Sequence, residues 1–158
     1  MAKVLLGFMG SGKTTIARLL DDQFVDMDAV LVERLGMPIT QFFEEEGEAA
    51  FRKVESQVLA ELLPQDIVLS TGGGVIMQAQ NRALLAQNAP NIFLTADFET
   101  LYQRLQADQE QKRPLVIEKS KEDLKALWAF RQPLYEAVAT QIIEVAGQTP
   151  AQIVEMIR

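Results

Sequence analysis

The segment that decides the fold is Gly7-Phe8-Met9-Gly10-Ser11-Gly12-Lys13-Thr14. It matches the pattern G-x-x-x-x-G-K-[ST] of a phosphate-binding loop at every fixed position. Such a loop needs a strand before it and a helix after it. Residues 3–6 are apolar enough for a buried strand, and residues 13–20 have the apolar spacing of a helix. Because both elements are predicted in the right places, a glycine-rich turn that matches by chance is the weaker interpretation.

Each part of this segment has an expected role in holding a nucleoside triphosphate. The glycines allow successive backbone N–H groups to point inward at a phosphate, at the positive end of the following helix. Lys13 would reach the β- and γ-phosphates, and the hydroxyl of Thr14 would be a magnesium ligand.

Composition limits the remaining possibilities. The chain has 158 residues, of which 48% are hydrophobic, enough for a single domain with one sizeable core. The net charge of −7 argues against a nucleic acid or an anionic membrane as partner, so an anionic ligand must be held by local arginines and lysines. Without cysteine or histidine, acid–base chemistry falls to aspartate or glutamate. The apolar run at 4–9 is too short to span a membrane and leads into the loop, so we expect a cytoplasmic protein.

Two carboxylates, Asp26 and Asp28, follow the next apolar segment. If residues 23–28 form a strand, both carboxylates share one face, at the sheet edge where ligands bind in parallel sheets. The alternative is that Asp28 only caps a helix over residues 29–35. The strand expected at 67–70 ends without an aspartate, so Asp26 is the best candidate to hold magnesium, through a water molecule.

Two arginines are candidates for binding an anionic substrate. Arg52 lies one position off the apolar stripe of a helix expected at about 48–63, where Glu55 could hold its guanidinium toward a carboxylate. A snorkelling surface arginine is the alternative. Arg131 lies just before Pro133, which should kink or break the helix that Ser120 begins, and an arginine at such a break could contact an anion.

Two further segments stand out from the pattern of helices and strands. Gly72-Gly73-Gly74 follows a buried strand, and three glycines are more than a turn needs, so we expect something bulky against that backbone. Residues 108–114 are polar and carry Arg113 directly before a proline. This segment suits a mobile lid that closes over phosphates, and an ordinary solvated loop is the alternative.

Taken together, these features resemble the shikimate kinase family over essentially the whole chain. The matching motifs, in the family's order and at nearly its spacing, are Gly10-Ser11-Gly12-Lys13-Thr14, Asp26-x-Asp28, Phe42-Phe43 to Gly47-Glu48, Phe51-Arg52 with Glu55, Gly72-Gly73-Gly74, Arg113-Pro114-Leu115 and Arg131-x-Pro133-Leu134-Tyr135. Many kinases and GTPases share the phosphate loop, whereas the combination is highly specific.

The resemblance implies an α/β fold of the P-loop NTPase class, of the nucleoside-monophosphate-kinase type. In this three-layer fold, helices flank a five-stranded parallel sheet of order 2-3-1-4-5. Residues 1–158 would form a single kinase domain, with a substrate-binding helical segment at about 28–63 and a lid at about 108–119. The implied activity is transfer of the γ-phosphate of ATP, with Mg²⁺, to the 3-hydroxyl of shikimate in aromatic amino acid biosynthesis. Shikimate and ATP would be the partners of a monomer.

The resemblance also implies a role for each site residue. Asp28 would hold and deprotonate the reacting hydroxyl, while Asp26 and Thr14 would serve the magnesium ion. Lys13 and Arg113 would stabilise charge in the transition state. The implied nucleotide-binding residues are Gly10, Ser11, Gly12, Lys13, Thr14, Thr15, Arg104, Arg113, Gln148 and Pro150, with Arg104 and Pro150 on either side of adenine. The implied substrate-binding residues are Asp28, Phe43, Phe51, Arg52, Gly72, Gly73, Gly74 and Arg131, with Arg52 and Arg131 clamping the carboxylate.

This sequence departs from the family pattern in two places. The chain from Lys13 to Asp26 is several residues shorter than usual, so the first helix should lose about a turn. The link from Arg104 to Arg113 is slightly longer, which weakens the adenine role of Arg104 more than the lid role of Arg113. The alternatives are another small-molecule kinase of this fold, such as a gluconate or nucleotide kinase, or a nucleotide-binding regulator without chemistry. The acid pair and the triple glycine favour shikimate, and no Asn-Lys-x-Asp guanine motif is present.

Overall fold

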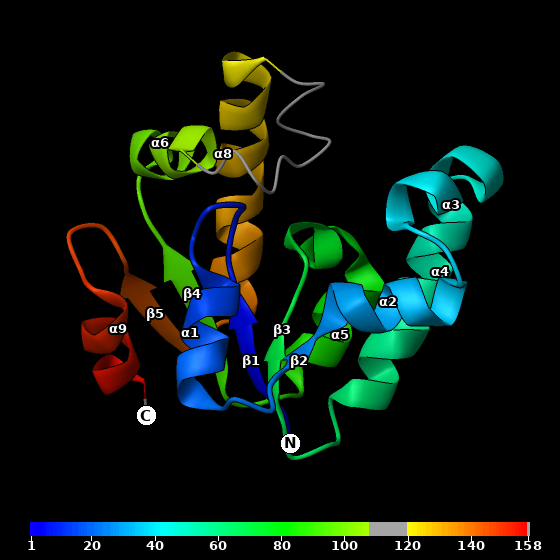
Figure 1. The fold of residues 1–158 in the computed structure, drawn as a ribbon, viewed down its shortest axis with the longest axis horizontal. Helices are drawn as coiled ribbons and strands as arrows, with labels where there is room; N and C mark the ends of the chain where they lie inside the picture. Colours follow the sequence, from blue (N-terminus) through cyan, green and yellow to red (C-terminus); the bar gives the residue numbers. More distant parts are fainter. Residues whose placement is uncertain (108–119, 158) are drawn as a thin grey trace.

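A computed structural model describes residues 1–107 and 120–157 of the chain. Within these residues, five strands form one parallel sheet of order β2-β3-β1-β4-β5, which confirms the predicted fold class and strand order (Figure 1). The strands are β1 (Lys3–Leu6), β2 (Val25–Asp26), β3 (Val68–Ser70), β4 (Asn91–Thr95) and β5 (Gln141–Glu144). The helices are α1 (Lys13–Leu20), α2 (Met27–Leu35), α3 (Ile39–Glu46), α4 (Glu48–Leu62), the 3₁₀ helix η1 (Gly73–Met77), α5 (Ala79–Ala86), α6 (Phe98–Ala107), α8 (Lys121–Val138) and α9 (Pro150–Met156).

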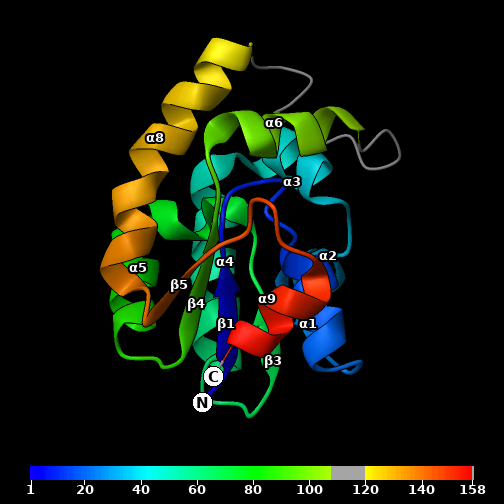
Figure 2. The ribbon, with the colours of Figure 1, turned by 90° about the vertical axis from the view of Figure 1, so that its left-hand side faces the viewer.

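Helices cover both faces of the sheet, so the central strands are apolar throughout. Along β1, Val4 and Leu6 point into one core and Leu5 points into the other. Residues of α4, α5 and α8 fill the first core, and residues of α1, α6 and α9 fill the second. Figure 2 shows α5 and α8 on one side of the sheet and α1 and α9 on the other.

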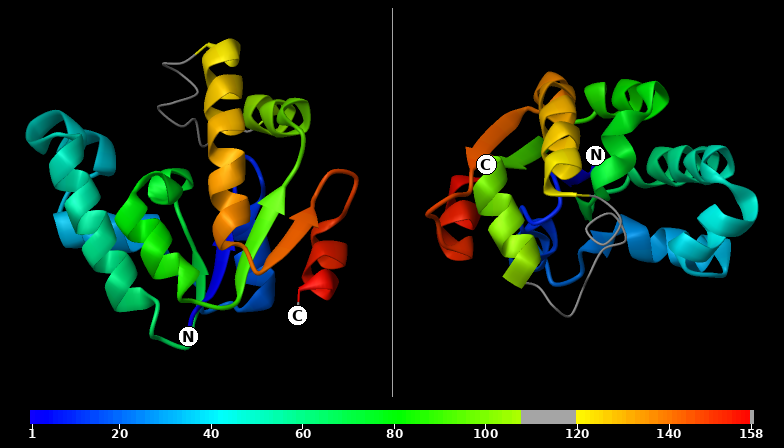
Figure 3. Two further views of the ribbon diagram at one scale, coloured as in Figure 1. Left: turned by 180° about the vertical axis from the view of Figure 1, so that it is seen from behind. Right: turned by 90° about the horizontal axis from the view of Figure 1, so that it is seen from above.

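The carboxyl ends of the strands lie along one edge of the sheet because all neighbouring strands pair in parallel. The loop of residues 7–12 leaves β1 at this edge, η1 follows β3 there, and α2 follows β2. The right-hand view of Figure 3 looks down on this edge from above, with α6 and α8 beside it. Ligands of open parallel sheets bind at such an edge, so the fold gathers the predicted site residues where a site is expected.

The strand predicted at residues 23–28 is shorter than expected, and this changes the position of Asp28. β2 contains only Val25 and Asp26, and α2 begins at Met27. The carboxylate of Asp26 caps this helix by accepting a hydrogen bond from the backbone N–H of Asp28 at 3.0 Å. The prediction that both aspartates share a strand face is therefore wrong, and so is the alternative that Asp28 is the cap. Aspartate is a strong N-cap, and it ends the strand here.

Of the kink or break predicted at Pro133, the break is wrong. α8 runs from Lys121 through Pro133 to Val138 without interruption. The proline removes one helical hydrogen bond, whereas the buried side chains of Tyr135 and Val138 continue to hold the helix against the core. The predicted cap of this helix is confirmed, since the hydroxyl of Ser120 accepts a hydrogen bond from the N–H of Asp123.

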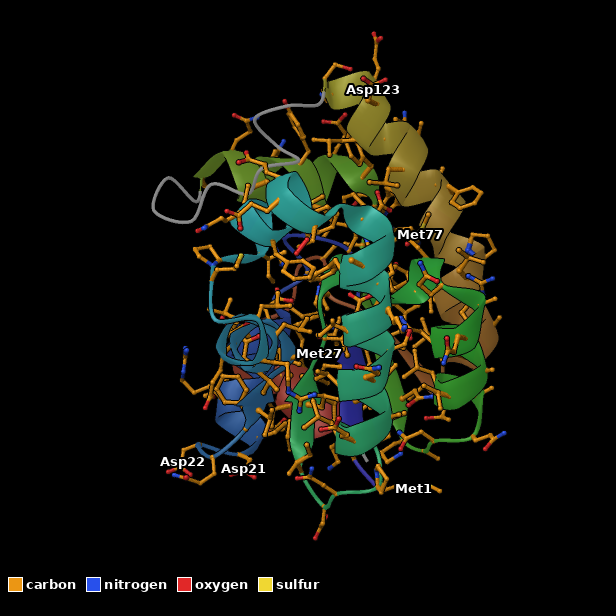
Figure 4. All side chains as sticks on the ribbon, turned by 90° about the vertical axis from the view of Figure 1, so that its right-hand side faces the viewer. Met1, Asp21, Asp22, Met27, Met77 and Asp123 are labelled. Carbon is orange, nitrogen blue, oxygen red and sulfur yellow. The ribbon has the colours of Figure 1, made fainter. Side chains whose placement is uncertain are left out.

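The other predicted helices and strands agree with the structure to within a few residues at their ends. Figure 4 shows the acidic side chains of Asp21 and Asp22 at the opposite end of the molecule from Asp123, so this part of the negative charge is spread over the surface. In the described part of the chain, no helix combines the length and apolar character needed to cross a membrane.

Candidate active site

The loop between β1 and α1 is shaped by glycines. Gly10 and Gly12 have φ angles of +82° and +90°, in the left-handed region that other residues avoid. Gly12 is also the N-cap of α1, so the backbone N–H groups at the start of this helix are turned toward the loop. The ammonium of Lys13 donates hydrogen bonds to the carbonyl oxygens of Gly7 at 2.6 Å and Phe8 at 3.3 Å. The predicted nucleotide residues of this loop are thus held in one compact turn.

The other residues of the loop divide into buried and exposed ones. Ser11 is buried, and its Oγ makes no hydrogen bond to the described residues. Thr14 and Thr15 are exposed in the first turn of α1. Both threonines are thus exposed at the sheet edge where β2 ends with the half-buried Asp26.

The three consecutive glycines pack against three of the predicted substrate-binding side chains. A Cβ atom added to each glycine would lie very close to one of them: 2.9 Å from Oδ1 of Asp28 at Gly72, 3.3 Å from Nη1 of Arg131 at Gly73, and 3.0 Å from Nη2 of Arg52 at Gly74. Contacts of 3.0 Å or less leave no room for a Cβ without a shift of the neighbour. The bulky groups expected against this backbone are thus an aspartate and two arginines, from α2, α4 and α8.

Arg52 is held on α4 by a carboxylate and two aromatic rings. Its Nη1 donates to both carboxylate oxygens of Glu55, at 3.0 and 3.1 Å. Its guanidinium carbon lies 5.3 Å from the ring centroid of Phe51 and 5.9 Å from that of Phe43. Only 16% of the side chain is exposed, which excludes the snorkelling surface arginine that was the alternative. Phe43 and Phe51, which were predicted to bind the substrate, therefore also hold the guanidinium of Arg52 in position.

The carboxylate of Glu55 is buried, and it is part of a network that the sequence did not reveal. The amide of Asn81 on α5 donates to Oε1 of Glu55 at 3.3 Å and to the carbonyl of Val75 at 3.0 Å. The hydroxyl of Ser56 donates in turn to Oδ1 of Asn81 at 2.6 Å. Burial raises the pKa of Glu55, while the neighbouring guanidinium of Arg52 opposes this rise. Asn81 lies 26 residues from Glu55 in the chain, so no local pattern could have indicated it.

Arg131 is 5% exposed, and two of its nitrogens have no hydrogen-bond partner among the described residues. Its Nε and Nη1 make no hydrogen bond to any described residue, although its guanidinium carbon lies 5.7 Å from the ring centroid of Phe8. Burial lowers the pKa of Arg131, and the positive charge of Arg52 acts in the same direction. Buried donors without acceptors are costly, so this pair of guanidinium groups suits an anionic ligand that accepts their hydrogen bonds.

On the other side of the loop, Arg104 of α6 connects two segments. Its Nη1 donates to the carbonyl of Gly10 at 3.4 Å and its Nη2 to that of Val145 at 3.5 Å. Arg104 is thus beside both the phosphate loop and the turn after β5. The amide of Gln148 instead donates within that turn, to the carbonyl of Glu144 at 3.1 Å. Pro150 is the exposed first residue of α9, and Arg113 lies outside the described residues.

Tyr135 belongs to the site, although sequence reasoning gave it no role. Its hydroxyl donates to the carbonyl oxygen of Gly73 at 2.7 Å and lies 3.2 Å from that of Gly7. The sequence could have indicated Tyr135 through its spacing from Arg131, because two residues four positions apart on one helix share a face.

Comparison with known proteins identifies relatives along the whole chain. The family model described as shikimate kinase matches residues 9–158. A shikimate kinase of Streptococcus gordonii is 50% identical over 159 aligned residues, which cover 100% of this chain and 99% of the relative. A shikimate kinase of Lactococcus lactis subsp. cremoris is 42% identical and covers 100% and 96% of the two chains.

Solved structures of shikimate kinases also resemble this chain. A shikimate kinase from Acinetobacter baumannii in complex with shikimate superposes with a TM-score of 0.88 at 36% identity, over 98% of this chain and 89% of that one. The shikimate kinase of Aquifex aeolicus superposes with a TM-score of 0.83 at 31% identity, over 99% and 93%. With the phosphate loop, the paired arginines and the triple glycine in place, the chain belongs to the shikimate kinase family.

Proposed function

We propose that this protein transfers the γ-phosphate of ATP to the 3-hydroxyl of shikimate and so supplies shikimate 3-phosphate for aromatic amino acid biosynthesis. The observation that carries this proposal is the convergence of Arg52, Arg131 and Asp28 on Gly72-Gly73-Gly74, beside the phosphate loop. Family membership and the similarity to a protein whose structure contains shikimate support it over a gluconate kinase or a regulator.

In this proposal the two guanidinium groups bind the carboxylate of shikimate. Glu55 and the aromatic rings orient Arg52, while Nε and Nη1 of Arg131, which have no partner among residues 1–107 and 120–157, donate to the second oxygen. Planar guanidinium and carboxylate groups match in geometry, and low exposure strengthens their attraction. Phe43 and Phe51 then face the apolar side of the ring, and Gly73 and Gly74 allow it to approach the backbone closely.

The chemical step is an in-line displacement at the γ-phosphorus. The 3-hydroxyl oxygen of shikimate forms a bond to phosphorus, the bond from phosphorus to the oxygen that bridges the β- and γ-phosphates breaks, and ADP leaves. The proton of the hydroxyl passes to the carboxylate of Asp28, since the chain contains no histidine or cysteine. Lys13 balances the negative charge that spreads over the phosphoryl oxygens.

The nucleotide side of the proposal assigns Gly10, Ser11, Gly12, Lys13, Thr14 and Thr15 to the phosphates of ATP, and Arg104, Gln148 and Pro150 to adenine. Thr14 and Asp26 would hold Mg²⁺, since a hydroxyl and a carboxylate are the oxygen donors that this ion prefers alongside its waters. The bound ion supplies charge neutralisation at the β- and γ-phosphates.

Three parts of the proposal rest on the sequence and the family alone. Arg113 would close over the transferring phosphate as part of a lid. The protein would act as a monomer with shikimate and ATP as its small-molecule partners. It would work in the cytoplasm.

The test is a coupled assay of ADP release with shikimate, gluconate and nucleoside monophosphates as acceptors. Of these acceptors, only shikimate is expected to support ADP release, and preference for another acceptor would contradict the proposal. Arg52→Ala and Arg131→Ala should each weaken shikimate binding by about 2–5 kcal/mol and leave the KM of ATP nearly unchanged. Arg34→Ala is the matched control, because Arg34 pairs with Glu61 on an exposed surface. If either variant changed only the KM of ATP, the two arginines would have been assigned to the wrong ligand.

A further inference from the structure

The side chain of Asn81 on α5 holds two groups that lie next to the guanidinium of Arg52. Its amide nitrogen donates to Oε1 of Glu55 at 3.3 Å, and the same oxygen accepts from Nη1 of Arg52 at 3.0 Å. The amide nitrogen also donates to the carbonyl of Val75 at 3.0 Å. Val75 directly follows Gly74, which packs against Arg52. One amide thus holds both the carboxylate and the backbone segment between them.

The partners of this amide fix its orientation. The carbonyl of Val75 and the carboxylate of Glu55 both accept hydrogen bonds, so the NH₂ group must face them. The amide oxygen then faces the hydroxyl of Ser56, which donates to it at 2.6 Å. Asn81, Ser56 and Glu55 are all buried. Turning the amide over would place its oxygen against two acceptors in a buried environment, so the side chain has one stable orientation.

Glu55 has charged neighbours on three helices, and Asn81 adds a neutral donor from a fourth. Arg52 on α4 and Arg131 on α8 are positive, whereas Asp28 on α2 is negative. Burial raises the pKa of Glu55, whereas the charge of Arg52 and the hydrogen bond from Asn81 oppose this rise. The hydrogen bond from Asn81 therefore favours the ionised carboxylate, which is the form that holds the guanidinium by charge-assisted hydrogen bonds.

The next residue of α5 makes a similar contact that does not involve Glu55. Nη1 of Arg82 donates to the carbonyl of Ile76 at 2.8 Å, which connects α5 with η1. Asn81 makes the corresponding contact one residue earlier, to Val75, and adds the hydrogen bond to Glu55. This added hydrogen bond is what connects α5 with the guanidinium of Arg52.

We propose that Asn81 is a positioning residue of the acceptor site, which acts through Glu55 to hold Arg52 where it binds the carboxylate of the acceptor. The identity of the acceptor as shikimate rests on the proposed function. The role of Asn81 itself rests on its hydrogen bonds to Glu55 and Val75.

The first test is the steady-state kinetics of Asn81→Leu, which keeps the approximate size of the side chain and removes its amide. The KM of shikimate should rise about 3- to 10-fold, with kcat and the KM of ATP nearly unchanged. Arg82→Met is the matched control, because it removes a contact between α5 and η1 and should leave the KM of shikimate nearly unchanged. An equal rise in Arg82→Met would overturn the inference, because loosening η1 would then be sufficient.

A double-mutant cycle tests whether Asn81 acts through Glu55. Glu55→Met keeps the approximate length of the side chain and removes both carboxylate oxygens. In this background Asn81→Leu should change the KM of shikimate less than 2-fold, because the group through which Asn81 acts is already lost. A rise as large as that in the unmodified background would overturn the inference.

The pKa of Glu55, measured by NMR titration of its carboxyl carbon, tests the same contact without a ligand. Asn81→Leu should raise this pKa further, and an unchanged value would overturn the inference. If Asn81→Leu does not fold, Ser56→Ala takes its place, since it removes the donor that orients the amide. Ser56→Ala should raise both the pKa of Glu55 and the KM of shikimate, and no change in either would overturn the inference.

The proposed function is tested separately by phosphorylation of shikimate by the unmodified protein. If shikimate is not phosphorylated, the proposed function fails, and the pKa of Glu55 still tests the role of Asn81. If shikimate is phosphorylated and Asn81→Leu changes neither the pKa of Glu55 nor the KM of shikimate, only the role of Asn81 fails.

Discussion

A Cβ atom on Gly74 would lie 3.0 Å from Nη2 and 3.1 Å from Nη1 of Arg52, so the glycine leaves the space that the guanidinium occupies. Because this glycine does not have a positive φ, alanine is compatible with its backbone, and the consequence of the change is steric. The position of Arg52 thus depends on a residue that lies 22 positions further along the chain, on a different element.

Gly74→Ala should displace Arg52 and raise the KM of shikimate about tenfold, within the roughly 1–3 kcal/mol that overpacking costs. Gly72→Ala should lower kcat instead, because its Cβ would lie 2.9 Å from Oδ1 of Asp28. Steady-state kinetics with both substrates distinguish the two effects. Equal losses in kcat for both variants would contradict the separate roles of Arg52 and Asp28.

Asp28→Asn keeps the size of the side chain and removes its charge and basicity. We expect kcat to fall about 100-fold or more, in the range of general-base contributions, while shikimate affinity falls less. The measurement is kcat at saturating ATP and shikimate over a range of magnesium concentrations. Recovery of kcat at high magnesium would mean that Asp28 helps to hold the magnesium ion and is not the general base.

Asp26 has a structural role in addition to the proposed magnesium role, and two variants separate them. Asp26→Asn keeps the N-cap of α2, since asparagine caps as well as aspartate, so activity should fall but recover partly at high magnesium. Asp26→Ala removes the cap as well and should cost about 1 kcal/mol of unfolding free energy. Urea denaturation checks this difference. Equal stability of the two variants would mean that the cap contributes nothing.

The raised pKa of Glu55 predicts a pH dependence of stability. Burial makes the folded protein hold this proton more tightly than the unfolded chain does. From the ordinary pKa of 4.5 up to the raised one, the free energy of unfolding that Glu55 contributes therefore falls as pH rises. Glu55→Gln removes this contribution, so the unmodified protein should lose stability relative to the variant as the pH rises above the ordinary pKa of 4.5.

Glu61→Gln is the control for this pH dependence. Its hydrogen bond with Arg34 lowers the pKa of Glu61, so its contribution has the opposite sign and is lost as pH falls. Urea denaturation at a series of pH values on both sides of 4.5 measures both differences. A relative stability of Glu55→Gln that does not change with pH would show that the burial of this carboxylate leaves its titration unaffected.

The sequence by itself determined the parts of this protein that depend on neighbouring residues. The strand over residues 3–6, the helix over residues 13–20 and the cap at Ser120 follow from apolar spacing and local hydrogen bonds, and the structure confirms them. The family resemblance extended this to the strand order and the candidate site residues, because specific residue types recur at a specific spacing.

Only the tertiary structure decided how the candidate site is assembled. Asp28 lies in a helix because the carboxylate of Asp26 caps α2 and ends the strand. Residues 25–28 have weak local preferences for both strand and helix, and the sequence did not show which one prevails. The partners of the triple glycine, the contact of Asn81 with Glu55 and the two carbonyls near Tyr135 all join segments far apart in the chain. Such contacts form only when α2, α4, α5 and α8 pack at the edge of the sheet, so their geometry is a property of the packed fold and not of any local pattern.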